Sequence, residues 1–261
     1  MPTADVNGQR IAYLDSGGDG PPVVLGHGFL MDKSMFDAQV AALGDDYRIV
    51  TWDERGFGDT EFDDQPFSYW DLAADCLGLM DHLGIDRAVV GGMSQGGFVA
   101  LRVALTAPER VRGLILLGTQ AGTEADENIP LYAAMIEDWS TNGPSDELAA
   151  TVAQIIITDT EHSPPWIETW QRRPRELIRQ PGATLLGRDD VTDRLGEITV
   201  RALVVHGTED QAIPMEDAEA LAAGLPGAGA VVKVGGAHAA NMTNPEPVNA
   251  AIGEFLGALA P

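Results

Sequence analysis

The sequence predicts an α/β protein with a doubly wound, mostly parallel sheet and a helical cap inserted into it. Short, uninterrupted apolar runs recur along the 261 residues, amphipathic stretches separate most of them, and one long segment lacks such runs. Apolar runs without alternating polar residues are typical of strands buried on both faces, as in parallel sheets. The alternation of strand and helix favours right-handed crossovers on both faces of the sheet.

The expected strands begin with an antiparallel hairpin over residues 5–14, because Asn7-Gly8 favours a tight turn. The remaining strands are predicted from six apolar runs, at residues 23–25, 49–50, 88–90, 114–117, 203–205 and 231–232. Each run is short enough for a buried strand rather than a helix.

Helices are expected where apolar residues recur on one stripe. In residues 70–83 the stripe comprises Leu72, Cys76, Leu79, Met80 and Leu83. Asp71, Asp75 and Asp81 are expected on the solvated side of this helix. Residues 97–105 are typical of a buried helix. The last helix has a stripe of Val248, Ile252, Phe255, Leu256 and Leu259.

Residues 122–190 interrupt this rhythm and are expected to form the inserted cap, a set of helices broken by prolines. The remaining residues, 1–121 and 191–261, are expected to form the core. Charge is uneven in the cap, because residues 113–171 contain no Lys or Arg and ten acidic residues. Four arginines then follow closely: Arg172, Arg173, Arg175 and Arg179.

Composition excludes several classes of protein. A formal net charge of −24 repels phosphate backbones, so we expect no nucleic-acid partner. Uninterrupted apolar stretches stay well short of the roughly 18 residues of a membrane span. The single cysteine, Cys76, excludes an intramolecular disulfide and a multi-cysteine zinc site. Without a recognisable signal peptide, we expect a cytoplasmic protein, a monomer or homodimer, with no membrane partner.

The segment Gly92-Met93-Ser94-Gln95-Gly96 fits the pattern G-x-S-x-G. In this pattern a serine on a tight turn between a strand and a helix presents its hydroxyl above the sheet, and the glycines permit the turn. A buried apolar run precedes Ser94 and a helical stretch follows it. Ser94 is therefore the candidate nucleophile.

A nucleophilic serine needs a base and an acid that orients the base, and at such sites the acid precedes the histidine in the chain. His238 follows the last strand run and is the candidate base. Two carboxylates follow the preceding strand, and Asp210 is favoured over Glu209 because Pro214 follows at a familiar spacing. His82, His162 and His206 are expected to be structural or solvated.

The oxyanion of an acyl-transfer intermediate needs two backbone donors. The N–H of Gln95, at the start of the helix, is one candidate, and the N–H of Phe29, in the loop after residues 23–25, is the other. His27 in this loop is expected to be structural and to form hydrogen bonds within the loop.

With these motifs in order, the sequence resembles the α/β-hydrolase fold superfamily, in its cap-bearing branch of esterases, lactonases, meta-cleavage-product hydrolases and haloperoxidase-type enzymes. The resemblance covers residues 5–260 outside the cap. It rests on residues 27–29, 53–58 and 206–207 together with the Ser94 motif, Asp210 and His238. It implies an eight-stranded sheet, no metal or organic cofactor, and a structural turn at residues 53–58 in which Arg55 ties loops together.

Two positions depart from the superfamily pattern. Thr60 replaces a common serine, and Gln95 stands where methionine, leucine or tryptophan often follows the nucleophile. The side chain of Gln95 is therefore expected to make the pocket wall more polar.

The expected function is hydrolysis of small carboxylic esters, with lactones as a further class, through an acyl-enzyme on Ser94. Apolar side chains of the cap are expected to contact the substrate: Tyr132, Met135, Trp139, Trp166 and Trp170. One alternative is carbon–carbon bond hydrolysis of meta-cleavage-type diketones, with Arg172, Arg173 and Arg175 available for a carboxylate. The other alternative is a receptor on this fold without turnover.

Overall fold

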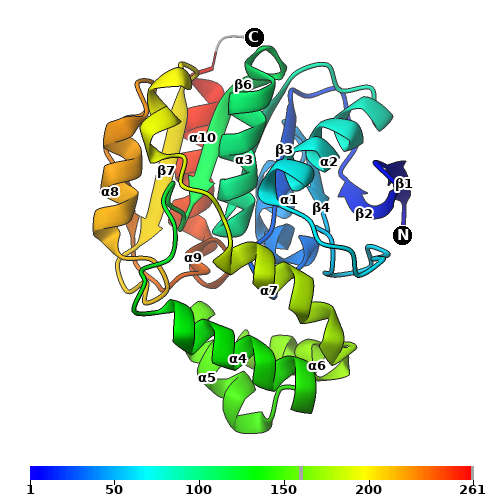
Figure 1. Ribbon diagram of the computed structural model, residues 1–261. Helices are drawn as coiled ribbons and strands as arrows, with labels where there is room; N and C mark the ends of the chain where they lie inside the picture. The colour runs from blue at the N-terminus through cyan, green and yellow to red at the C-terminus, as the bar shows by residue number, and fades with distance from the viewer. Residues whose placement is uncertain (159–160, 260–261) are drawn as a thin grey trace.

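The computed structural model describes residues 1–158 and 161–259; residues 159–160 of the expected cap and 260–261 of the expected core lie outside the described part. One sheet with the strand order β1-β2-β4-β3-β5-β6-β7-β8 forms the centre of the molecule (Figure 1). The strands are β1 (Thr3–Val6), β2 (Gln9–Asp15), β3 (Pro22–Gly26), β4 (Arg48–Trp52), β5 (Ala88–Met93), β6 (Val111–Leu117), β7 (Ala202–Gly207) and β8 (Val232–Val234).

The pairing of the strands confirms the predicted doubly wound, mostly parallel sheet. The hairpin of β1 and β2 and the pairing of β2 with β4 are antiparallel. The pairings from β4 through β3, β5, β6 and β7 to β8 are parallel. Each predicted apolar run lies in or beside one of these strands, because burial on both faces selects apolar residues at successive positions.

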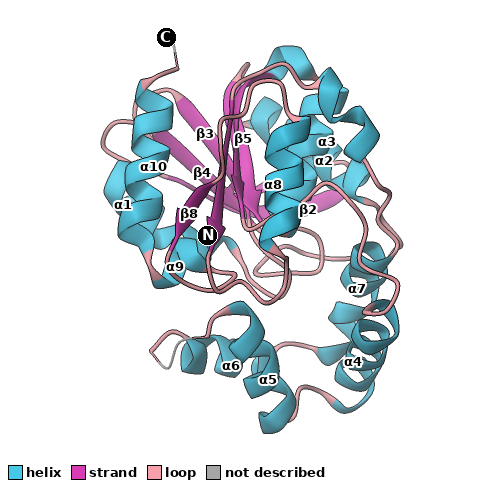
Figure 2. Cartoon of the chain, turned by 90° about the vertical axis from the view of Figure 1, so that its left-hand side faces the viewer, coloured by secondary structure: helices cyan, strands magenta, loops and turns pink. Residues whose placement is uncertain are grey.

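Helices cover both faces of the sheet (Figure 2). The helices α1 (Asp37–Leu43) and α10 (Pro245–Gly257) cover one face, and α2 (Tyr69–His82), α3 (Gln95–Thr106) and α8 (Met215–Gly224) cover the other. The short helix α9 (Ala240–Thr243) follows β8. The predicted apolar stripes of α2 and α10 are largely buried against the sheet. Within the described residues, no helix is long and apolar enough to cross a membrane.

Among the residues that the structure describes, four α-helices lie between β6 and β7 and form a layer of their own beside the carboxyl ends of the parallel strands (Figures 1 and 2). They are α4 (Ile129–Asn142), α5 (Asp146–Ile156), α6 (Ser163–Arg172) and α7 (Arg179–Leu186). Short 3-10 helices lie between the other elements, at Lys33–Phe36, Pro108–Arg110, Arg175–Ile178 and Thr192–Glu197. Loops that follow β5, β7 and β8 therefore face the helices of this layer.

The prediction that Asp75 lies on the solvated side of α2 is wrong. Its side chain is fully buried and accepts hydrogen bonds from Arg55 Nε at 2.6 Å and Nη2 at 2.9 Å, as well as one from Asn7 Nδ2 at 3.0 Å. The charge of Arg55, in the loop after β4, thus compensates a carboxylate that the helical pattern alone assigns to solvent. The pair ties this loop to α2.

We expect Asp75→Asn to lower the free energy of unfolding by about 3 kcal/mol, because it leaves the Arg55 guanidinium without its charged partner in a buried setting. The matched control is Asp81→Asn, since Asp81 on the same helix pairs with Arg110 but is 66% exposed. The control should cost less than about 1 kcal/mol. Equal losses in urea unfolding of the two variants would contradict the assignment.

Candidate active site

Ser94 lies on a strained turn between β5 and α3. Its backbone has φ 52° and ψ −113°, a conformation that side-chain-bearing residues rarely adopt. Its N–H donates to Leu117 O at 2.9 Å, and its carbonyl accepts from Thr119 Oγ1 at 2.8 Å and from the N–H of Gly97 at 2.9 Å. These bonds to β6, to the loop after it and to α3 hold the turn in place.

The glycine of the motif at position 96 is required by a close contact between backbones. A Cβ atom at Gly96 would lie 2.0 Å from the carbonyl oxygen of Gly26, at the end of β3. The N–H of Gly96 donates to His27 O at 3.1 Å across the same contact. The start of α3 therefore lies directly on the end of β3, as the pattern predicts for a serine held above a sheet.

His238 and Asp210 form a hydrogen-bonded pair next to this turn. His238 Nδ1 lies 2.7 Å from Asp210 Oδ2, and Asp210 Oδ1 accepts the N–H groups of Ala212 at 2.9 Å and Ile213 at 3.0 Å. Burial opposes ionisation of Asp210, but the hydrogen bonds and charge interactions, led by His238, lower its pKa below the usual value. An ionised Asp210 fixes the proton on Nδ1, which leaves Nε2 of His238 free to accept one.

Glu209, the other carboxylate considered for this role, is exposed at the surface. Asp210 has a second histidine neighbour besides His238. His206, buried at the end of β7, places Nε2 at 3.3 Å from Asp210 Oδ2 and at 2.9 Å from Ile213 O. His206 is thus structural, as expected, but its contact with Asp210 could not be inferred from its position in a strand.

The two candidate oxyanion donors have their N–H groups available. In the described part of the chain, neither Phe29 nor Gln95 donates its N–H to a protein acceptor. His27 is fully buried and bonds within its own loop, as predicted, with Nδ1 2.8 Å from Gly28 O. Its Nε2 also accepts the N–H of Glu54, in the loop after β4, at 3.0 Å. Burial lowers the pKa of His27, so the neutral tautomer matches these two bonds.

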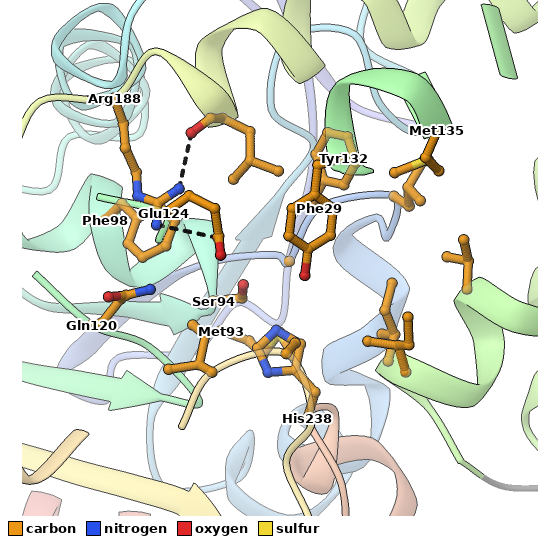
Figure 3. Close-up of a pocket in the computed structure, with 18 residues that line it drawn as sticks. Phe29, Met93, Ser94, Phe98, Gln120, Glu124, Tyr132, Met135, Arg188 and His238 are labelled. Carbon is orange, nitrogen blue, oxygen red and sulfur yellow. Dashed lines mark hydrogen bonds and ion pairs between the residues drawn. The ribbon is translucent and has the colours of Figure 1, made fainter. Parts of the chain in front are cut away.

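Ser94 and His238 line one cavity of about 90 Å³ between the sheet and the α4–α7 layer (Figure 3). Of the expected cap residues, Tyr132 and Met135 line it. Its other walls are mostly apolar, with Phe29, Met93, Phe98, Val152, Ile156 and Leu185 among them. This volume has room for about three water molecules, so only a small chemical group fits inside it.

The three tryptophans expected at the substrate do not line this cavity in the described structure. Trp139 and Trp170 pack edge to face, with ring centroids 6.0 Å apart, and Trp170 Nε1 donates to Leu30 O at 2.7 Å. Trp166 Nε1 lies 3.2 Å from the sulfur of Met242. Large amphipathic rings gain most where their apolar area is buried and their N–H is paired, and here that place is the seam between the helical layer and the core.

Two charged residues that line the cavity, Arg188 and Glu124, are not among the site residues predicted from the sequence. The Arg188 guanidinium donates to Gly122 O at 3.0 Å and Leu185 O at 2.9 Å, and its Nη2 lies 3.8 Å from Glu124 Oε2 (Figure 3). It also lies over the Phe98 ring, 4.7 Å from the centroid. Arg172, Arg173, Arg175 and Arg179 form a cluster that is visible in the sequence. Arg188 has no basic residue near it in the sequence, so no local pattern predicts its role.

The side chain of Gln95 does not make the cavity wall polar, contrary to the prediction. It is buried on the far side of the turn and donates from Nε2 to Glu54 Oε2 at 2.7 Å. Its Oε1 lies 3.3 Å from the hydroxyl of Tyr69. Gln95 begins α3 directly after Ser94, and its side chain is buried in the protein outside the cavity.

Comparisons with known proteins agree with this architecture. Residues 21–245 match the protein family described as alpha/beta hydrolase fold. A curated protein of Rhizobium rhizogenes, named "Putative carbamate hydrolase RutD", is 30% identical over 92% of this chain and 94% of its own length. Two solved structures are similar: an esterase from Thermogutta terrifontis and an enol-lactonase from Burkholderia xenovorans.

The esterase is 30% identical with a TM-score of 0.88, and the match covers 99% of this chain and 98% of the esterase. The enol-lactonase is 28% identical with a TM-score of 0.90, and the match covers 98% of this chain and 100% of the enol-lactonase. The names of these three proteins all describe hydrolases, although of different substrates.

The assignment of the acid can be tested by labelling Ser94 with a fluorophosphonate. Asp210→Asn should slow labelling by about three to four orders of magnitude, because an amide at this position favours the wrong tautomer of His238. Glu209→Gln is the matched control and should label at the wild-type rate, since this neighbour is exposed. Slow labelling of the Glu209 variant together with normal labelling of the Asp210 variant would reverse the assignment.

Proposed function

Because the chain belongs to the α/β-hydrolase fold family, we propose that it is a serine hydrolase that cleaves small carboxylic esters, lactones included, through an acyl-enzyme on Ser94. One observation carries the proposal: His238, held by Asp210 at 2.7 Å, lines the same cavity as Ser94. This arrangement supplies a nucleophile, a base and an acid that orients the base. The hydrolase names of the relatives support hydrolytic chemistry in general.

In the proposed reaction, Ser94 Oγ attacks the ester carbonyl carbon while His238 Nε2 takes the hydroxyl proton. The electron pair of the carbonyl moves to its oxygen, where the N–H groups of Phe29 and Gln95 stabilise the negative charge. Collapse of this intermediate breaks the bond to the alcohol, which leaves with the proton from His238. Water then loses a proton to His238 as its oxygen attacks the carbonyl carbon of the acyl-enzyme. Collapse of this second intermediate breaks the bond to Ser94 Oγ, which takes the proton back from His238, so that the acid and free Ser94 are released.

We propose that residues 122–190 act as the cap that sets the substrate. Tyr132 and Met135 on α4 and Val152 and Ile156 on α5 contribute apolar walls to the cavity. Apolar walls around a volume of about 90 Å³ favour a short acyl or alcohol group over a long chain.

Hydrolysis of p-nitrophenyl esters from acetate to palmitate, with a panel of lactones, tests the reaction. We expect turnover that is highest for short chains and falls by several orders of magnitude in Ser94→Ala. Thr208→Ala, a change at an exposed position of the β7 loop, is the control and should keep the wild-type rate. Turnover retained in Ser94→Ala would refute the acyl-enzyme route, and absence of both turnover and fluorophosphonate labelling would favour a receptor.

A second candidate function, hydrolysis of substrates that carry a carboxylate, is favoured by Arg188. Its side chain is only 2% exposed and lines the cavity beside Ser94, and its ion pair with Glu124 is long, at 3.8 Å. A substrate carboxylate could therefore form charge-assisted hydrogen bonds there. Diketones of the meta-cleavage type belong to this class. Arg172, Arg173 and Arg175 do not line the cavity in the described structure.

The role of Arg188 can be measured with two esters of similar length, mono-p-nitrophenyl glutarate and p-nitrophenyl hexanoate. Arg188→Gln should lower kcat/KM for the charged ester by about 10- to 100-fold, because it removes a charged hydrogen-bond donor. The same variant should leave the neutral ester within about threefold. Equal losses for both esters would show that Arg188 supports the cavity without recognising charge.

A further inference from the structure

A cluster of buried polar side chains lies behind Ser94, outside the cavity. Its members are His27 after β3, Glu54 after β4, Tyr69 on α2 and Gln95 on α3. All four side chains are almost inaccessible to solvent, and none of them touches the substrate in the proposed reaction. Buried polar groups are costly unless they are paired, so a cluster at this place needs an explanation.

We propose that Glu54 is a positioning residue for the oxyanion hole, which it holds together by connecting the two loops that carry the donors. This inference rests on the proposed function, since it concerns the same site. One loop carries the N–H of Phe29, and the other carries the N–H of Gln95. Glu54 belongs to neither loop, but it is bonded to both.

The connection to the Gln95 loop runs through side chains. Gln95 Nε2 donates to Glu54 Oε2 at 2.7 Å, and the Tyr69 hydroxyl donates to Gln95 Oε1 at 3.3 Å. Burial raises the pKa of Tyr69, so its hydroxyl stays a donor. Both the nitrogen and the oxygen of the Gln95 side-chain amide are therefore held by hydrogen bonds. Because the side chain is fixed, the backbone N–H of the same residue, the candidate oxyanion donor, is fixed with it.

The connection to the Phe29 loop runs through His27. The backbone N–H of Glu54 donates to His27 Nε2 at 3.0 Å, and the opposite ring nitrogen bonds to Gly28 O at 2.8 Å. The carbonyl of His27 accepts the N–H of Gly96 at 3.1 Å. The ring and the backbone carbonyl of His27 thus fix the segment that leads into Phe29. The same carbonyl links this segment to the start of α3, which carries Gln95.

The setting of Glu54 favours a neutral carboxylic acid. Its Oε1 has no hydrogen-bond partner among the described residues and lies close to Gly26 in a site without solvent. Burial, with the nearby charges of Asp75 and Asp53, raises the pKa of Glu54 well above its usual value. A neutral acid still accepts the bond from Gln95, and it avoids the cost of an unpaired buried charge beside the nucleophile. Gln should therefore replace Glu54 well, whereas an apolar residue of the same length should not.

The test compares kcat and KM of Glu54→Met, Glu54→Gln and Gln95→Met on the best ester of the series. An oxyanion hole acts in the transition state, so Glu54→Met and Gln95→Met should lower kcat about tenfold or more with KM within about twofold. Glu54→Gln should stay within about threefold of the wild type. The double variant Glu54→Met/Gln95→Met should lose less than the product of the single losses, because both partners of one bond are removed together.

Hydrogen exchange of the peptides that contain Phe29 and Gln95 provides a readout that needs no substrate. Exchange should accelerate in the Gln95 peptide in Glu54→Met, because that variant loses the side-chain bond, and stay at the wild-type rate in Glu54→Gln. The Phe29 peptide should change less, because its bond to Glu54 uses the backbone N–H that both variants keep. In addition, the wild type at pH 7 should show an infrared carbonyl band of a protonated carboxylic acid that is missing in Glu54→Gln. Loss of thermal stability in Glu54→Met with unchanged kcat and exchange would overturn the proposal and leave Glu54 a purely structural residue.

These readouts separate the two proposals. If the wild type neither hydrolyses esters nor reacts with a fluorophosphonate, the proposed function fails, and hydrogen exchange still decides whether the Glu54 side chain orders the Gln95 segment. If the wild type is active and Glu54→Met keeps its kcat, only the positioning role fails.

Discussion

The site depends on one steric constraint, the contact between the backbone at the start of α3 and the end of β3. Gly96 lies so close to Gly26 that a methyl group at position 96 would overlap the carbonyl oxygen. The turn at Ser94, beside this contact, has a strained conformation, and bonds to Leu117 at the end of β6 and to Thr119 just after it hold the turn there. The strain is local, so the surrounding sheet must be rigid enough to maintain it.

The parallel sheet then brings the other groups to the same edge. Asp210, the candidate acid, follows β7, and His238, the candidate base, follows β8. The order of strands therefore brings Ser94 and His238 to one cavity, with Asp210 bonded to His238 behind it. Two further connections reinforce this edge. His206 contacts Asp210 from within β7. Gly118, at φ 50°, lies close to the backbone of His238, because a Cβ there would lie 3.0 Å from His238 O.

Most of the sheet and the main residues of the candidate site could be predicted from the sequence, because they follow local rules. Runs of apolar residues, a glycine-flanked serine and a carboxylate or histidine just after a strand all leave signals within a few positions. The errors have another origin. Asp75 is buried because Arg55 lies opposite it, and Gln95 turns inward because Glu54 receives it, so each depends on a residue distant in sequence. Arg188 lies just after α7, and the path of the chain there places its side chain at the cavity. No local sequence pattern predicts that path.

The hydrogen bond from Trp170 to Leu30 has a consequence for how such folds diversify. The indole belongs to α6 of the helical layer, whereas the carbonyl belongs to the residue directly after Phe29. The helical layer is therefore not an independent module. Its contact with the core uses Leu30, which belongs to the same loop as Phe29, the candidate oxyanion donor. A chimaera that grafts a foreign helical layer onto this core inherits the new cavity shape only if it also supplies a donor for Leu30. The hydrogen bond at this contact, rather than the shape of the cavity, then decides which foreign helical layers leave the Phe29 loop correctly placed.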